Sequence, residues 1–424
     1  MEIIKNSRLG ESYFRIKHKS GLTIILYPMK GYSSVYATFG TKYGSVDTEF
    51  KTNKDKDFIT VPAGIAHFLE HKLFENEDCD VFELYAKTGA SGNAYTSFDK
   101  TCYLFSCTDK FKESLKILLD FVQAPYFTEQ TVAKEQGIIG QEIRMYDDNP
   151  GWRVFFNLLN ALYVNHPVKI DIAGTVDSIS EITAELLYDC YNTFYNLNNM
   201  VLSVAGNFEI DDVLSVADEC LKQNENITIE RSTYDEPDTI AQPEITQELS
   251  VAFPLFSIGF KAKPLYGREL LKATYETKLA MDLIAGDTSP LYREMYESGL
   301  INETFSNEVF FGNGYFAPIF EGESKKPKEV CEKLKSEIEK LKNGEIDLKR
   351  FNAVKKSNYG ELVASFNSVS SVAEAALSAE FTDVNLYDGI EILAAVTPED
   401  VRNRIKAVFR SENSALSIIK PAKA

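Results

Sequence analysis

Two histidines and a glutamate are grouped in the segment 64–75, which reads GIAHFLEHKLFE. His67 and His71 are four residues apart, so on a helix their imidazoles project from one face, one turn apart, at a separation that suits two ligands of one metal ion. Glu70 lies between them in the sequence, and its carboxylate can reach a water on that metal without binding the metal itself. The spacing predicts a zinc site in which Glu70 acts as a general base.

The same three residues could also meet by chance on an ordinary amphipathic helix. The chain has only four histidines, so a chance match to the order HxxEH is expected at roughly a few in a thousand. The apolar residues of the segment would bury the remaining helix surface against a sheet: Ile65, Phe68, Leu69, Leu73 and Phe74. We therefore favour the metal site over the chance match.

A tetrahedral zinc ion that keeps a water molecule needs a third protein ligand. The predicted helix 128–146 holds Glu135 and Glu142, which are seven residues apart, so both carboxylates face one side while Ile138 and Ile139 pack. One carboxylate can bind the metal, and the other can orient a metal-binding histidine. The spacing does not rank the two glutamates, and an exposed acidic helix face would show the same pattern.

The composition is that of an ordinary globular protein. A chain of 424 residues with 44% hydrophobic residues is long enough for two domains, each with its own core. The net charge is −18, from 45 Lys and Arg against 63 Asp and Glu, which argues against nucleic acid or an anionic membrane as the partner.

The N-terminal residues contain no apolar run of signal-peptide length, and no stretch approaches the roughly 20 apolar residues that a membrane span requires. We therefore expect a cytoplasmic protein without a membrane span. Six cysteines are scattered without CxxC spacing, and we expect them to be reduced and mostly buried: Cys79, Cys102, Cys107, Cys190, Cys220 and Cys331.

Strand and helix patterns occur in both halves of the chain. In the first half, strands are expected near 13–16, 22–26, 34–39, 101–106 and 200–205, and helices near 110–123, 128–146, 152–163 and 180–194. In the second half, strands are expected near 256–260, 315–320 and 414–419, and helices near 268–284, 326–341, 346–365 and 397–409.

The end of the chain repeats the order of elements found at 180–206, with a helix and then a buried strand, which indicates an internal duplication. We predict an α+β fold of two homologous lobes, each a mostly antiparallel sheet covered by helices. The predicted catalytic, zinc-binding lobe spans 1–222, a linker spans 223–247, and a second lobe without metal ligands spans 248–424.

An HxxEH segment followed further along the chain by a helix of the form E-x6-E resembles the inverted-zincin metallopeptidases, the group of pitrilysin, insulin-degrading enzyme and the mitochondrial processing peptidase. The segments 67–75, 137–143 and 171–175 match the single-length bacterial members of the YmfH type, and the resemblance covers nearly the whole chain. It implies that the two lobes form half of a clamshell. It also implies one zinc ion per chain, with His67, His71 and Glu142 as ligands, Glu70 as the base and Glu135 as the supporting acid.

The resemblance also identifies the segment 89–96 as an active-site strand, on which a peptide substrate is laid as an added strand. Asn93 would offer an amide to the substrate backbone, and Ala94 would help to line the cleft. From the sequence alone, Asn93 after Gly92 fits a turn residue as well.

One feature of the family is missing from the second lobe. Relatives usually supply an arginine and, seven residues later, a tyrosine that grip the substrate carbonyl. Here Arg293 is followed seven residues later by Leu300, and Tyr296 stands in the usual place of the arginine. We therefore expect a second, related chain to supply the pair in a heterodimer, or else a homodimer with weaker carbonyl binding.

These patterns together predict a zinc-dependent endopeptidase that hydrolyses peptides or unfolded segments. The alternative is a non-catalytic scaffold that binds peptides or a homologous peptidase subunit. The intact HxxEH segment favours the enzyme, because a scaffold has no need of a base beside a pair of metal ligands.

Overall fold

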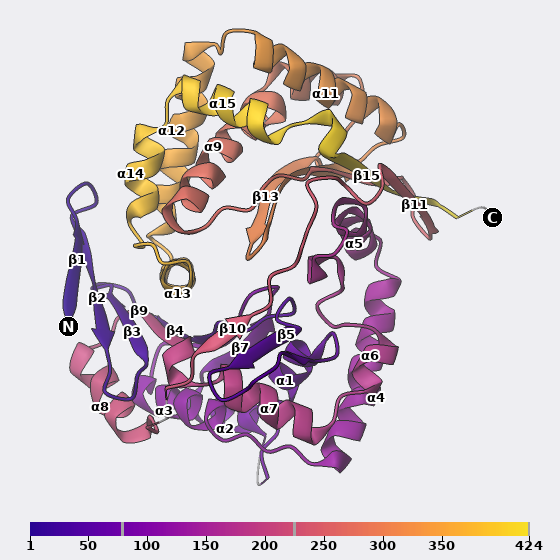
Figure 1. The fold of residues 1–424 in the computed structure, drawn as a ribbon. Coiled ribbons are helices and arrows are strands. Elements are labelled where there is room, and N and C mark those ends of the chain that lie inside the picture. The colour runs from indigo at the N-terminus through magenta and orange to yellow at the C-terminus, as the bar shows by residue number, and fades with distance from the viewer. Residues whose placement is uncertain (78–79, 224–225, 423–424) are drawn as a thin grey trace. The chain divides into compact units, whose positions relative to one another are not determined.

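The computed structural model describes residues 1–77, 80–223 and 226–422, and Figure 1 shows the fold. These residues form two compact units. The first unit comprises Met1–Ile143, Asp171–Ser232 and Val363–Tyr387, and the second comprises Arg144–Ile170, Thr233–Leu362 and Asp388–Ala424. Each unit has its own sheet.

The main sheet of the first unit has seven strands in the order β1-β2-β3-β9-β4-β8-β7. Their bounds are β1 (Glu2–Asn6), β2 (Glu11–Lys17), β3 (Thr23–Pro28), β4 (Val35–Thr41), β7 (Ser91–Thr96), β8 (Thr101–Cys107) and β9 (Met200–Gly206). Strands β3 and β9 are parallel, and the other neighbours are antiparallel. A small second sheet joins β10 (Ile229–Arg231), β5 (Glu49–Thr52) and β6 (Ile59–Thr60). Strand β7 is an edge of the main sheet.

Helices cover both faces of the main sheet (Figure 1). The helices that belong wholly or mainly to this unit are α1 (Ile65–Leu73), α2 (Val81–Thr88), α3 (Phe111–Val122), α4 (Glu129–Asp147), α6 (Val176–Ser180), α7 (Ala184–Phe194), α8 (Ile210–Cys220) and α13 (Val369–Phe381). Helices α3 and α1 pack on the side of β8 and β4 that carries Tyr103 and Phe105, whereas α13 packs on the opposite face of β9, β4 and β3.

The second unit has a five-stranded sheet in the order β11-β15-β12-β14-β13. The strands are β11 (Glu244–Leu249), β12 (Leu255–Phe260), β13 (Ser306–Gly312), β14 (Tyr315–Glu323) and β15 (Ser414–Pro421). The helices are α5 (Pro150–Leu162), α9 (Gly267–Ala285), α10 (Pro290–Glu297), α11 (Pro327–Asn343), α12 (Leu348–Ser365), α14 (Asp388–Ala395) and α15 (Pro398–Val408). An apolar core joins the sheet to α9, α11 and α15.

The two sheets share one connectivity. The parallel pair β11 and β15 corresponds to β3 and β9, and the antiparallel strands β12, β14 and β13 follow in the same order as β4, β8 and β7. The predicted α+β fold of two similar lobes, each a mostly antiparallel sheet covered by helices, is confirmed.

The two units exchange one helix each. Helix α5 comes from the first half of the chain but packs on β15, β12 and β11 of the second unit. Helix α13 comes from the second half but packs in the first unit, where the Glu374 carboxylate accepts hydrogen bonds from the hydroxyls of Tyr36 at 2.9 Å and Tyr95 at 2.5 Å. Apolar periodicity shows that a helix has a buried face but not which sheet buries it, and the predicted lobes 1–222 and 248–424 do not contain this exchange.

Other differences from the predicted elements are local. The predicted linker 223–247 contains β10, which pairs with β5, and the start of β11, which pairs with β15. Cys79 lies outside the described residues, and the other five cysteines are buried and form no disulfide. Within the described ranges, no helix is both long and apolar enough to cross a membrane.

Candidate metal centre

Helix α1 starts at a close approach between two backbone segments of the first unit. Gly64, just before the helix, has a φ of 89°, and a Cβ atom there would lie 2.3 Å from the carbonyl oxygen of Ala173. Gly174 has a φ of 75°, and its Cβ atom would lie 2.4 Å from the carbonyl oxygen of Ala63. Only glycine fits both positions, which explains why the segment 171–175 contains Gly174 and why α1 begins just after Gly64.

Helix α1 is buried on almost every side. Ile65, Phe68, Leu69 and Leu73 are at most 2% exposed, as the sequence predicted, whereas Phe74, just after the helix, is only half-buried. His67 and Glu70 are each only 9% exposed, and the helix packs against β7, β8 and α7. Because tight packing fixes the helix on all sides, the polar side chains that it carries have little freedom to move away from one another.

The structure brings His67, His71 and Glu142 together. One ligand atom from each of these residues lies within 4.8 Å of the other two. His67 Nε2 is 3.8 Å from Glu142 Oε1, and His71 Nε2 is 3.5 Å from Glu142 Oε2. All three side chains belong to the first unit, with the histidines on α1 and the glutamate on α4.

The geometry ranks the two glutamates of α4, which the sequence did not. Glu142 faces the Nε2 atoms of both histidines, whereas Glu135 Oε1 lies 3.0 Å from the other ring nitrogen of His71, Nδ1. Glu135 is buried, with 8% of its surface exposed. Glu142 therefore occupies the place of a ligand, and Glu135 the place of an acceptor that orients the His71 ring.

The packing of α4 differs from the prediction in one respect. Ile139 is fully buried, but Ile138 is 46% exposed. The helix turns 100° per residue, so the face that buries Ile139 and Glu135 leaves its neighbour Ile138 at the solvent side.

The donor set fits a zinc ion. Two imidazoles and a carboxylate are typical ligands of catalytic zinc, and tetrahedral ligands bound at their usual distances lie about 3.3 to 3.6 Å apart. The observed separations of 3.5 and 3.8 Å are close to that range. The third separation, between the histidines, is also within 4.8 Å.

The surroundings of the two histidines push their pKa values in opposite directions. Burial lowers the pKa of His67 to about 3, and the neighbouring His71 adds to this effect. For His71, burial also lowers the pKa, but the hydrogen bond with Glu135 and the charges of Glu70 and Glu142 outweigh it and raise the pKa overall. His67 is therefore neutral at pH 7, which is the form that binds a metal.

Only one of the two rings has a hydrogen-bonded support. His67 Nδ1 is buried and has no hydrogen-bond partner among the described residues, so packing alone orients this ring. His71 is held by Glu135. The two histidines thus depend on different parts of the structure.

Glu70 is connected to the edge strand. Its Oε2 atom accepts a hydrogen bond of 2.7 Å from the hydroxyl of Thr96, the last residue of β7. Burial raises the pKa of Glu70, although the hydrogen bond from Thr96 acts in the opposite direction. Sequence reasoning did not single out Thr96, and its only signal was a polar residue at the end of the predicted active-site strand.

Asn93 and Ala94 lie within β7, so Asn93 is not a turn residue. Strand β7 pairs with β8 on one side and ends the sheet on the other. The Asn93 side chain is exposed, and its Oδ1 atom accepts a hydrogen bond from the Ala94 N–H at 2.9 Å. Ala94 is half-buried.

The segment that lacks the arginine and tyrosine pair forms α10 and the turn after it, in the second unit. Arg293 is exposed, and the ring of Tyr296, which is 43% exposed, stacks on Tyr292. Leu300 is buried, so the position seven residues after Arg293 offers no polar group.

The other two histidines lie outside the site. His18 contacts Ser20 and Asp218. In the second unit, His166 Nε2–H donates to the Asn313 carbonyl at 3.0 Å, while Nδ1 accepts from the Val168 N–H. Burial lowers the pKa of His166 to about 4, so this side chain is a neutral structural group.

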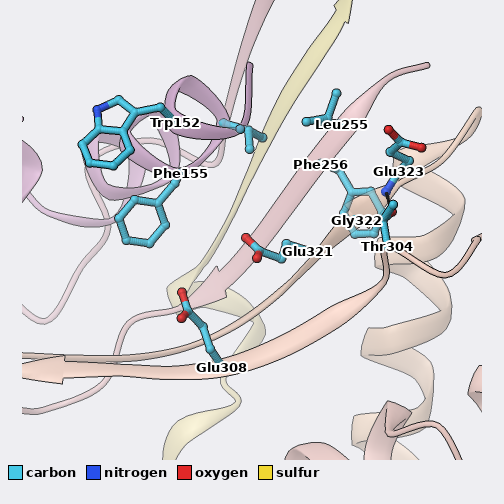
Figure 2. Close-up of a pocket in the computed structure, with 11 residues that line it drawn as sticks. Trp152, Phe155, Leu255, Phe256, Thr304, Glu308, Glu321, Gly322 and Glu323 are labelled. Atoms are coloured by element: carbon cyan, nitrogen blue, oxygen red, sulfur yellow. Dashed lines mark hydrogen bonds between the residues drawn. The ribbon is translucent and has the colours of Figure 1, made fainter. Parts of the chain in front are cut away.

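A separate cavity of about 480 Å³ lies within the second unit, beside α5 (Figure 2). Trp152 and Phe155 form one side, and Glu308 and Glu321 project from β13 and β14 on the other. Burial raises the pKa of both glutamates, and the charge of Glu321 adds to the effect on Glu308. Among the described residues that line the cavity there is no histidine or cysteine, so it does not resemble the donor set on α1 and α4.

Comparison with known proteins identifies the family. Residues 61–176 match the family model described as insulinase, peptidase family M16, and residues 181–358 match the model described as the peptidase M16 inactive domain. An uncharacterized zinc protease of Bacillus subtilis, YmfH, is 39% identical over 424 residues, which cover 99% of each chain. The chain belongs to peptidase family M16.

A solved structure agrees with the M16 fold over nearly the whole chain. The putative M16-like peptidase from Alicyclobacillus acidocaldarius has a TM-score of 0.94 and 34% identity, and covers 97% of this chain and 98% of its own. A protease from Helicobacter pylori has a TM-score of 0.84 at 20% identity, with 96% and 99% covered, and shares the fold. The predicted membership of the inverted-zincin family is confirmed, and relatives in this family are named zinc proteases.

Proposed function

We propose that the chain is a zinc-dependent endopeptidase that hydrolyses peptides or unfolded segments. One observation carries the proposal. Ligand atoms of His67, His71 and Glu142 converge within 4.8 Å, and Glu70 lies on the same buried helix as the two histidines. His67, Glu70 and Glu135 are buried, and helices with a purely structural role would gain nothing from burying them, since each buried polar group costs desolvation energy.

A zinc ion held by His67, His71 and Glu142 would supply Lewis acidity toward the scissile carbonyl and lower the pKa of a water molecule at the site. Glu70 would take the proton from this water and deliver it to the leaving amine. Its burial raises its pKa, which makes it a stronger base than an exposed carboxylate. Glu135 keeps the His71 ring in the orientation that points Nε2 toward Glu142.

The edge strand β7 would hold the substrate. An unpaired strand edge can form backbone hydrogen bonds with an extended peptide largely independently of the side chains of that peptide. Asn93 and Ala94 lie on this strand, which also carries the Thr96 contact to Glu70. A folded substrate cannot supply a free extended segment, so the proposal restricts substrates to short peptides and unfolded chains.

The lack of an arginine and tyrosine pair leads to a proposal about partners. The second unit offers Arg293 and a buried Leu300 where relatives grip the substrate carbonyl. We propose that a homologous chain supplies the pair in a dimer, and that the isolated chain is slow. Adding a purified homologue with the pair should then raise turnover, whereas a full rate in a strictly monomeric sample would contradict this.

The test of the proposed function is digestion of a mixture of unlabelled peptides, read by mass spectrometry. The zinc-loaded chain should produce internal cleavages that stop with a chelator and return when zinc is added back. His71→Ala should lose both zinc and cleavage. A zinc-loaded sample that binds peptides but cleaves none, alone and with a homologue, would favour the scaffold.

A further inference from the structure

Thr96 connects the edge strand to the base. Its hydroxyl donates to Glu70 Oε2 at 2.7 Å. Glu70 is only 9% exposed, so water cannot easily replace this donor. Hydrogen bonds to a charged acceptor in such surroundings are strong and directional.

The position of Thr96 is itself fixed by the neighbouring strand. Thr96 is the register partner of Thr101 on β8, and Thr101 is fully buried. The Thr101 hydroxyl lies 2.9 Å from the carbonyl oxygen of Tyr43 and 3.3 Å from Thr96 Oγ1. Each hydroxyl has one proton, so Thr101 donates to the closer Tyr43 oxygen while the Thr96 proton is directed at Glu70.

We propose that Thr96 is a positioning residue for the reaction, which holds Glu70 Oε2 so that Oε1 receives the proton of the attacking water. Thr96 keeps its own proton throughout, and no bond to it is made or broken. The strand that would carry the peptide thus also sets the orientation of the base. This inference rests on the proposed peptidase function.

Two substitutions separate the hydroxyl from the shape of the side chain. Thr96→Val keeps the volume and the backbone N–H but removes the hydroxyl donor, whereas Thr96→Ser keeps the donor and removes a methyl group. We expect Thr96→Val to lower kcat by about tenfold to a hundredfold, the range for losing one charge-assisted hydrogen bond, with KM changed by less than about twofold. Thr96→Ser should recover most of the lost kcat, and zinc content should be the same in all three proteins.

A matched control is available in the second unit. Thr246 is an exposed strand residue whose hydroxyl also donates to a glutamate, Glu244, at 3.3 Å. Thr246→Val makes the same chemical change and should leave kcat unaltered. A readout without metal or substrate completes the test: in crystal structures of the metal-free variants, Glu70 should keep its position in Thr96→Ser and rotate away in Thr96→Val.

Each result decides the proposal. It is overturned if Thr96→Val turns over at the wild-type rate, if Thr96→Ser is as slow as Thr96→Val, or if only KM changes. An unmoved Glu70 in the Thr96→Val crystal structure would overturn it as well. A wild-type chain without chelator-sensitive cleavage would overturn the proposed function and this inference together, whereas an active wild type with an equally active Thr96→Val variant overturns the inference alone.

Discussion

Glu135 offers a quantitative test of how the site is built. Its Oε1 atom lies 3.0 Å from His71 Nδ1, and the Glu135 side chain is 11% exposed. A hydrogen bond to a charged group is worth about 1.5 to 3 kcal/mol, which corresponds to roughly 10-fold to 150-fold in an equilibrium constant. Loss of an outer support typically lowers metal affinity by about 10-fold to 100-fold, which agrees with this range.

We therefore predict that Glu135→Ala binds zinc about 10-fold to 100-fold more weakly than the wild type, measured by competition with a chromophoric chelator. Glu135→Gln keeps an oxygen acceptor and should lose less. Glu142→Gln should lose more than Glu135→Ala, because it removes the charge of a ligand. Glu113→Gln, a change of the same type on the exposed face of α3, controls for net charge.

Two results would refute the reasoning. Zinc affinity of Glu135→Ala within twofold of the wild type would mean that the hydrogen bond to His71 does not support the ligand. Equal losses in Glu135→Ala and Glu142→Gln would mean that the two glutamates have the same role, contrary to their positions at opposite nitrogens of His71.

Three further outcomes follow from the structure. Glu374→Ala leaves two half-buried tyrosine hydroxyls without their acceptor, so it should lower the free energy of unfolding of the first unit by about 2 kcal/mol in urea titrations. The control Ser371→Ala, at an exposed position on the same helix, should change this free energy little, and equal effects of the two substitutions would contradict the prediction. Burial lowers the pKa of His166 to about 4 beside Glu236 and Lys261, so as the pH falls the unfolded chain takes up this proton before the folded chain does. Between about pH 6.5 and pH 4 the free energy of unfolding of the second unit should therefore fall by up to roughly 3 kcal/mol, and His166→Asn should not show this loss. Parallel pH profiles of the two proteins would contradict the prediction. Removing zinc from the purified protein should lower its Tm, because a ligand that binds only the folded state stabilises it, and an unchanged Tm would argue against a bound metal.

Part of the candidate site follows from local helix geometry. His67, Glu70 and His71 are close in the chain, so helical geometry alone indicates their common face. Glu135 and Glu142 share one face of α4 for the same reason, but only the placement of α4 beside α1 separates ligand from support. The sequence did not predict the role of Thr96, because the contact between Thr96 and Glu70 joins the end of a strand to a helix residue 26 positions away in the sequence.

The main unpredicted feature of the fold is the exchange of α5 and α13. Helix α13 is rich in alanine and serine, and its apolar side chains contact β9, β4 and β3, which come from a distant part of the sequence. Its position is fixed by tertiary contacts such as those of Glu374 with Tyr36 and Tyr95, and of Leu377 with Gly40. The local pattern of apolar and polar residues carries no information about such contacts. A division of the sequence into two consecutive lobes therefore did not predict that α5 and α13 pack in the opposite unit.

The proposed mechanism requires that Glu70 acts as a base beside the zinc ion and is not itself a zinc ligand. The most direct test compares zinc content and peptide cleavage in the same samples of wild type and Glu70→Gln. We predict one zinc ion per chain in both proteins and a loss of about 10²-fold to 10⁴-fold in turnover for Glu70→Gln. Cleavage by Glu70→Gln at the wild-type rate, with zinc bound, would contradict the account.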